Sequence, residues 1–144
     1  MLLQLLFTLY YLFRLRYIHP IAKDHFNFFN QFEEPFFGVT VDIDCTIAYQ
    51  KCKKEGIGFF LYYLHQALAA ANAIENFRLR IENNQIYIYD KVHASAVINR
   101  PNNTFGFSYI DYFSDFNEFK TAAQIEIEQV RNSTGLNLAG NDAN

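Results

Sequence analysis

The most constraining feature of the chain is a long apolar stretch with helical character, residues 58–74. It reads GFFLYYLHQALAAANAI, and apart from two tyrosine hydroxyls its only polar side chains are His65, Gln66 and Asn72. A helix that is apolar on most sides must be buried on most sides. Its three consecutive alanines, residues 69–71, predict close approach to a neighbouring sheet. A lone histidine in such a helix indicates a hydrogen-bonded structural residue more than a ligand or a base.

Strands on both sides of this helix can provide that sheet. Val39, Val41 and Ile43 alternate with polar residues, which predicts a half-buried strand. Four later strands form two pairs with turn residues between them. The expected strands of these pairs are residues 78–81 with 85–89, and 94–99 with 104–110.

Two further helices complete the pattern. A short amphipathic helix over residues 46–54 ends at Gly56, and a longer one spans residues 114–133 with Gly135 as its stop signal. The core stripe of the longer helix is predicted to consist of Phe116, Phe119, Ala123, Ile127 and Val130. The order of elements predicts an α+β or mixed sandwich layout.

Length and charge restrict the classes of function. The chain has 144 residues, the usual size of one domain, and 51% of them are hydrophobic. Its net charge is −3, and the small group of lysines at residues 51, 53 and 54 is expected to be a solvated helix face. Nucleic acid is therefore not an expected partner, because an acidic chain without a basic stripe holds phosphates poorly.

The first 22 residues form an atypical apolar segment, and we expect the domain to begin at residue 23. Arg14 and Arg16 follow the apolar run instead of preceding it, so the segment does not have the form of a secretory signal. The run is also too short to span a bilayer comfortably, and no membrane association is expected. A first strand, a buried helix or an unnatural start of the reading frame remain open for it.

The residues by themselves name no reaction. Cys45 and Cys52 are seven residues apart, which fits neither a metal knuckle nor a redox pair and favours ordinary thiols in a reducing cytoplasm. Asp42 and Asp44 share one face of a strand, where a solvated polar surface is the stronger interpretation. No histidine has a nearby serine, cysteine or aspartate arrangement that indicates a nucleophile, and no metal site is expected.

The stretch HFNFFNQFEEPFFG, residues 25–38, is unusual in holding six phenylalanines beside an acidic pair and a proline turn. Residues 23–32 have helical spacing, and the Glu-Glu-Pro run ends that pattern. Such density fits either a packed core or the lining of a pocket for an aromatic ligand.

Six short segments, taken together and in order, resemble the chloramphenicol acetyltransferase family. They match its K-E-H-F-x-F-aromatic opening, its long helix, its E-F-R strand, the hairpin return, the E-T-F strand start and the Y-x-x-D-F helix entry. The segments are KDHFNFF at 23–29, FFL at 59–61, NFRLRI at 76–81, QIYIYDKV at 85–92, NTF at 103–105 and YFSDF at 112–116. The resemblance covers residues 23 to about 134.

The resemblance implies an α+β fold, an incomplete form of the family's two-layer sandwich in which helices pack on a mixed or antiparallel sheet. It also implies a reaction, a quaternary structure and catalytic residues. Enzymes of that family transfer an acetyl group from acetyl-CoA to a drug hydroxyl, and they are trimers with active sites between subunits. A histidine in an H-H-x-x-x-D-G motif acts as general base, and a serine helps to stabilise the tetrahedral intermediate. The small-molecule acceptor carries an aromatic ring, which requires apolar and aromatic walls.

By position, the resemblance places the acceptor-binding residues at Phe28, Phe29, Phe37 and Phe105. Phe29 stands where a tyrosine is common, and Phe107 stands where small residues are frequent. Three other phenylalanines are expected to be plain packing residues: Phe26, Phe32 and Phe36.

The departures from the family bear on catalysis. The sequence contains no H-H-x-x-x-D-G motif and no histidine after His93, so no catalytic residue is assigned. The family's arginine partner of the motif's aspartate corresponds to Ala22. The later strands that complete the CoA tunnel are also missing, which counts against acetyl-CoA binding by this chain alone.

Two interpretations follow. In the favoured one, the chain is a truncated piece of an acetyltransferase that is inactive alone and has an open sheet edge. In the other, it is a non-catalytic module derived from that fold, which binds a small molecule or a partner.

Overall fold

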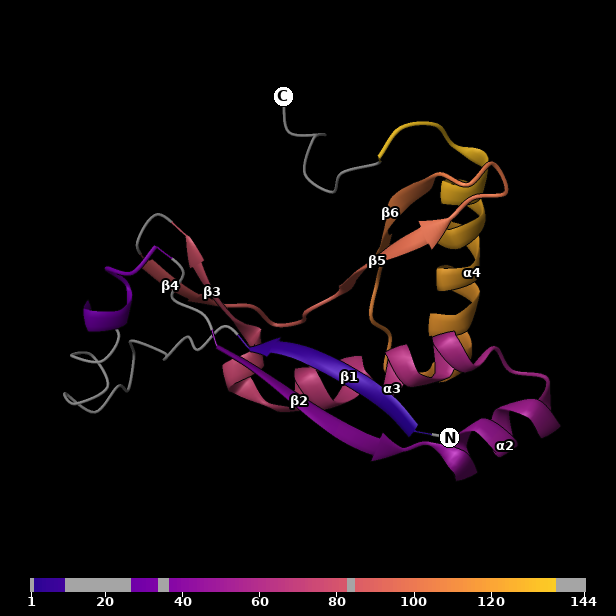
Figure 1. The fold of residues 1–144 in the computed structure, drawn as a ribbon, viewed down its shortest axis with the longest axis horizontal. Coiled ribbons are helices and arrows are strands. Elements are labelled where there is room, and N and C mark those ends of the chain that lie inside the picture. The colour runs from indigo at the N-terminus through magenta and orange to yellow at the C-terminus, as the bar shows by residue number, and fades with distance from the viewer. Residues whose placement is uncertain (1, 10–26, 34–36, 83–84, 137–144) are drawn as a thin grey trace. The chain divides into compact units, whose positions relative to one another are not determined.

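The computed structural model describes residues 2–9, 27–33, 37–82 and 85–136 (Figure 1). A helical turn at residues 27–29 is followed by β2. The other helices and strands, in chain order, are β1 (Leu2–Leu9), β2 (Phe37–Asp44), α2 (Thr46–Glu55), α3 (Phe59–Ala73), the 3-10 helix η1 (Glu75–Arg78), β3 (Leu79–Glu82), β4 (Gln85–Ile88), β5 (Ala94–Asn99), β6 (Phe105–Ile110) and α4 (Phe116–Asn132). The predicted α+β class and the predicted order of elements are confirmed.

The chain divides into two compact units, which are described separately. The first comprises Met1–Phe59 and Ala70–Lys91, and the second comprises Phe60–Ala69 and Val92–Asn144. Both units therefore include part of α3. The described strands form three antiparallel pairs, β1–β2 and β3–β4 in the first unit and β5–β6 in the second.

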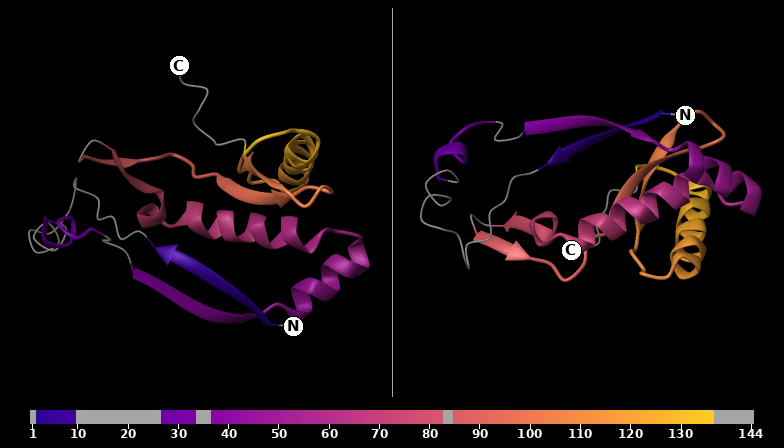
Figure 2. Two further views of the ribbon diagram at one scale, coloured as in Figure 1. Left: turned by 45° about the horizontal axis from the view of Figure 1, so that its top comes forward. Right: turned by 90° about the horizontal axis from the view of Figure 1, so that it is seen from below.

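In the first unit, β1 and β2 lie side by side over eight residue pairs, from Leu2↔Asp44 to Leu9↔Phe37 (Figure 2). Of the possibilities left open for the N-terminal segment, residues 2–9 thus form a strand. β2 is a strand as predicted, but its predicted half-burial is wrong, because Val41 is 44% exposed and Ile43 is 40% exposed. Pairing with β1 satisfies the backbone of β2 without covering its faces, and alternation alone does not supply a covering layer.

Helix α2 has the predicted C-terminal stop. Gly56 adopts a left-handed conformation with φ of 66°, and its N–H donates to the carbonyl oxygen of Cys52. Glycine adopts this conformation without a steric penalty, so the chain can leave the helix there. At the other end of α2, the N–H of Thr46 donates to Asp44 Oδ1 at 2.9 Å.

The second unit contains a core between α4, the β5–β6 pair and the central part of α3. Its fully buried centre includes Phe119 and Ala123 of α4 together with Ile110 of β6. The predicted stripe of α4 is confirmed, with Phe116 partly buried and the other four residues buried. Helix α4 lies against one face of β5–β6 in the different views (Figure 2). Asp115 caps it by accepting hydrogen bonds from the N–H groups of Asn117 and Glu118 at 2.9 and 3.0 Å.

Arg100, in the turn between β5 and β6, ties the strands to the end of α4. Its side chain is buried, and every N–H of the guanidinium has an acceptor. The acceptors are the carbonyl oxygens of Val130, Phe105 and Gly135 and the hydroxyls of Thr104 and Ser133, at 2.6–3.4 Å. Gly106 makes room for this arrangement, because a Cβ there would collide with Arg100 Nη2 and lie 2.9 Å from Val130 Cγ1.

Within the described part of the chain, no helix has the length and apolarity needed to cross a membrane.

Candidate aromatic binding site

Three phenylalanines of the Phe-rich stretch form a local cluster in the first unit. The rings of Phe28, Phe29 and Phe32 contact one another edge to face, with centroid separations of 5.2, 5.2 and 5.6 Å. Phe28 and Phe29 are on a helical turn, and the N–H of Phe32 donates to the carbonyl oxygen of Phe29 at 3.0 Å. This turn brings the third ring back onto the first two.

The cluster is open to solvent. Phe28 is 59% exposed, Phe29 is 49% exposed and Phe32 is 48% exposed. Phe28 and Phe29 were predicted to line an acceptor pocket, and their exposure leaves the rings accessible to a ligand. Phe32 was predicted to be a packing residue, but it is as exposed as its neighbours. Helical spacing alone places the three residues on one side, and it does not reveal that this side is uncovered.

The remaining phenylalanines of that stretch are described less completely. Phe37 is the first residue of β2, and its backbone alone is described. Phe26 and Phe36, both predicted to be packing residues, lie outside the described residues. Phe105, the fourth predicted acceptor residue, is the first residue of β6 in the second unit.

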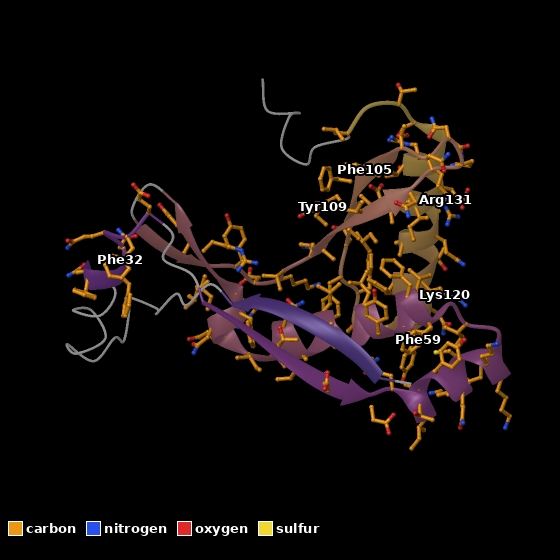
Figure 3. The ribbon with its side chains drawn as sticks, in the orientation of Figure 1. Phe32, Phe59, Phe105, Tyr109, Lys120 and Arg131 are labelled. Carbon is orange, nitrogen blue, oxygen red and sulfur yellow. The ribbon has the colours of Figure 1, made fainter. Side chains whose placement is uncertain are left out.

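Phe105 belongs to a row of aromatic side chains on β6. It is 44% exposed, and its ring contacts that of Phe107 edge to face at 6.0 Å. Tyr109 continues the row and is 52% exposed, and Val97, which pairs with Phe107 across the strands, is 56% exposed. Figure 3 shows Phe105 and Tyr109 extending from β6 on the side away from α4. The alternation of residues 105, 107 and 109 could have indicated this face from the sequence.

The two described histidines have different surroundings. His65 is buried, with Nε2 donating to the carbonyl oxygen of Phe113 at 3.0 Å and Nδ1 accepting from Gln66 Nε2 at 3.2 Å. Both ring nitrogens are therefore used, and the predicted structural role of His65 is confirmed. His93 is partly exposed, and its Nδ1 lies 3.0 Å from the N–H of Tyr112 and 3.0 Å from Asp111 Oδ1.

The cysteines do not form a reactive site. Cys45 and Cys52 are free and buried. Burial raises the pKa of the Cys52 thiol, and the nearby Glu55 carboxylate raises the pKa further. A thiol with a raised pKa stays protonated near neutral pH and is a poor nucleophile.

A shallow depression of about 520 Å³ lies on the outer side of α4. Its lining residues all come from this helix: Gln124, Ile125, Glu128, Gln129 and Asn132. A single helix supplies a floor and no facing wall, so a bound molecule would keep most of its surface in water. The aromatic surfaces are therefore the better candidates for a ligand site.

Comparison with known proteins shows the family of the chain. The family model for chloramphenicol acetyltransferase matches residues 14–144. Curated relatives named chloramphenicol acetyltransferase include one from Escherichia coli and one from Acinetobacter baumannii. Each is 28% identical over 98 residues, which are 67% of this chain and 45% of the relative. A relative of the same name from Proteus mirabilis is 25% identical over 108 residues, 74% of this chain and 50% of its own length.

A solved structure of a chloramphenicol acetyltransferase is also similar to this chain. The fold matches that of a chloramphenicol acetyltransferase with a TM-score of 0.75 and 33% sequence identity, over 83% of this chain and 57% of the solved one. The chain spans about half the length of the curated relatives it matches.

Proposed function

Because the chain belongs to the chloramphenicol acetyltransferase family, we propose that it carries the acceptor-binding side of an acetyltransferase. The reaction would transfer an acetyl group from acetyl-CoA to a hydroxyl of a small aromatic drug such as chloramphenicol. The family match over residues 14–144 is the observation that carries this proposal. The relatives named after this reaction support it.

The residues proposed to contact the acceptor are Phe28, Phe29 and Phe37 of the first unit and Phe105 of the second. The exposed rings of Phe28, Phe29 and Phe105 support this role, since a ligand can reach them without unfolding the chain. Aromatic side chains hold a planar ring through edge-to-face and offset-stacked contacts, which contribute beyond the area they bury. Phe32 is a further candidate in the same cluster, because its ring contacts both Phe28 and Phe29.

This 144-residue chain by itself is proposed to bind an acceptor without acetylating it. General-base catalysis needs a group within hydrogen-bonding reach of the acceptor hydroxyl, and the family's H-H-x-x-x-D-G motif is not in the sequence. His65 cannot replace it, because Phe113 and Gln66 occupy its two ring nitrogens. The homotrimer and the cytoplasmic location that the family resemblance implies are part of the same proposal.

The test combines turnover with binding. Thiol release from acetyl-CoA in the presence of chloramphenicol should not exceed that of a heat-inactivated sample, while calorimetry should show saturable drug binding. The double substitution Phe28→Ala and Phe29→Ala should weaken binding about tenfold or more, because two aromatic contacts are lost. Ile47→Ala, at an 83% exposed position on α2, is the control and should leave binding unchanged. Absence of drug binding would overturn the proposal, and turnover would overturn its claim of inactivity.

The second candidate function is a non-catalytic binding module derived from this fold. The exposed aromatic rings favour it, because a ligand or partner that covers them need not be acetylated. The DNA after the Asn144 codon distinguishes the candidates. A downstream frame that encodes H-H-x-x-x-D-G supports the acetyltransferase, and an unrelated intergenic region supports the module.

A further inference from the structure

The end of the β5–β6 pair that lies away from its turn brings a histidine and an aspartate together. Ala94 at the start of β5 pairs with Ile110 at the end of β6, so the next two residues, His93 and Asp111, lie opposite each other. His93 Nδ1 is 3.0 Å from Asp111 Oδ1. The two side chains are 27% and 56% exposed, so water can deliver a proton to this pair.

The same ring nitrogen has a second partner. The backbone N–H of Tyr112 donates to His93 Nδ1, also at 3.0 Å. An imidazole nitrogen that accepts a hydrogen bond has a lone pair and no hydrogen, whereas one that donates carries a hydrogen. Nδ1 can therefore bond either the Tyr112 N–H or the Asp111 carboxylate, and it cannot bond both in one protonation state.

The groups around His93 keep its ring in place for both partners. Asp111 and Tyr109 are the titratable side chains whose contacts with His93 the structure describes, and the Tyr109 ring lies 5.7 Å away at an interplanar angle of 31°. Beyond them, Glu126 of α4 accepts from the Tyr109 N–H at 2.9 Å. A phenol is uncharged near neutral pH, so the Asp111 carboxylate is the acceptor for a hydrogen on Nδ1. Because both partners of Nδ1 lie at the same distance, the ring can change partner without turning.

Hydrogen bonds to two histidines hold the segment between β6 and α4. One is the bond from the Tyr112 N–H to His93, which is only partly buried. In the other, the carbonyl oxygen of Phe113 accepts from His65 Nε2 at 3.0 Å, and His65 is buried. The Tyr112 ring also packs against the core and lies 5.9 Å from the His65 ring. Loss of the bond at His93 would therefore loosen residues 111–113 without detaching them from the core.

We propose that His93 is a pH-sensitive switch that holds the segment between β6 and α4 when it is uncharged and loosens it when it is protonated. In the uncharged ring the hydrogen is on Nε2, and Nδ1 accepts from the Tyr112 N–H. At lower pH a proton from water binds the Nδ1 lone pair, and the new Nδ1–H donates to the Asp111 carboxylate. The Tyr112 N–H then has no acceptor at this nitrogen. Histidine ordinarily titrates between pH 5 and pH 8, so the switch operates in that range.

The experiment is NMR spectroscopy of the full ¹⁵N-labelled chain between pH 5 and pH 8. The nitrogen resonances of the His93 ring report which nitrogen carries a hydrogen. Exchange protection of the Tyr112 amide, corrected for the intrinsic pH dependence of exchange, reports its hydrogen bond. The Phe119 amide, which donates to the Asp115 carbonyl oxygen at 3.1 Å in the same unit, is the internal control. The variants are His93→Asn, which keeps an acceptor near the position of Nδ1 but does not titrate, and Asp111→Ala.

In the wild-type chain at pH 8, the His93 ring should carry a hydrogen on Nε2 only. Between pH 8 and pH 5 the protection of the Tyr112 amide should fall about fivefold, with the same midpoint as the ring resonances, while that of Phe119 stays constant. His93→Asn should remove the pH dependence at Tyr112. Asp111→Ala should reduce the fall between pH 8 and pH 6 by about half or more, because the charged ring loses its acceptor.

A hydrogen on Nδ1 at pH 8 would overturn the proposal, because the uncharged ring would then already donate to Asp111. So would a Tyr112 amide that does not follow the His93 titration, or one that keeps its pH dependence in His93→Asn. An unchanged response in Asp111→Ala would exclude the carboxylate as the acceptor. The wild-type measurements decide the matter if a variant does not fold. None of these results depends on drug binding, so the proposed function is tested separately.

Discussion

The strand pairs β5–β6 and β1–β2 are both antiparallel, yet they differ in how far their apolar side chains are buried. On β6, residues 106, 108 and 110 are buried, and helix α4 packs against them. On β2, the apolar residues Val41 and Ile43 keep 44% and 40% of their surface exposed. The difference lies in the covering layer, because strand pairing satisfies backbone groups and leaves the faces to be buried by something else.

The covering layer of β5–β6 follows directly in the chain. Asp115 starts α4 five residues after β6 ends at Ile110, and the stripe of α4 then repeats at helical spacing from Phe116 to Val130. Short connections bring consecutive elements together, so this core is largely local in sequence. A local core of this kind should be the most stable part of the chain.

The largest expected effect is therefore the removal of Phe119, whose side chain is fully buried. Phe119→Ala should lower the free energy of unfolding by about 3–5 kcal/mol, because a core cavity remains. Val41→Ala on β2 should lower it by no more than about 0.5 kcal/mol, as at other exposed positions. Urea unfolding followed by circular dichroism measures both. Equal losses would show that β2 is buried in solution and would end the contrast between the two ribbons.

The sequence predicts the elements of this fold better than their burial. The stop at Gly56 and the buried stripe of α4 follow from local signals, and both predictions are confirmed. The exposure of Val41 and of Phe32 could not be predicted, because it depends on which surfaces lie over them and no local pattern encodes that.

The candidate site, like the burial of the strands, could be predicted from the sequence only in part. Phe28, Phe29, Phe37 and Phe105 were assigned by family resemblance, and their role remains a prediction. The alternation along β6 places Tyr109 on the face of Phe105, but its orientation by His93 depends on a contact between residues 16 positions apart. The role of Arg100 could not be predicted from the sequence, since its acceptors extend as far along the chain as Gly135.

The next largest effects on the free energy of unfolding are expected at Arg100 and at Gly106, which lies against the Arg100 guanidinium. Arg100→Met should destabilise the chain by roughly 2–3 kcal/mol, because it leaves buried carbonyl oxygens without donors. Gly106→Ala should cost about 1–3 kcal/mol, because the new Cβ would overlap the guanidinium and crowd Val130. The double variant should cost less than the sum, since methionine can move away from the new methyl group. Fully additive unfolding free energies would contradict the proposed contact.

A smaller effect is expected at the outer edge of β6. Glu126→Ala removes the acceptor of the Tyr109 N–H, and the loss of one solvent-accessible hydrogen bond should cost about 0.5 kcal/mol. Hydrogen exchange of the Tyr109 amide should become about twofold faster. Glu126→Gln retains an acceptor oxygen and is the control. Unchanged exchange in Glu126→Ala would show that this edge is protected by other groups.

The smallest expected effect is a pH-dependent one at the start of α2. It compares Asp44, which precedes α2, with Asp115, which precedes α4. Hydrogen bonds from the Thr46 side chain and backbone N–H lower the pKa of the Asp44 carboxyl below its ordinary value. A lowered pKa in the folded state means that the carboxylate contributes stability above the ordinary pKa of about 4, and that this contribution is lost as the pH falls through the lowered value. The Thr46 amide resonance should therefore titrate at a lower pH than a free aspartate, and Asp44→Asn should abolish the transition. Asp115→Asn is the matched control and should leave the Thr46 titration unchanged. A Thr46 titration at the ordinary aspartate pKa would mean that this exposed bond is not populated, and that no side chain accepts from the first N–H of α2.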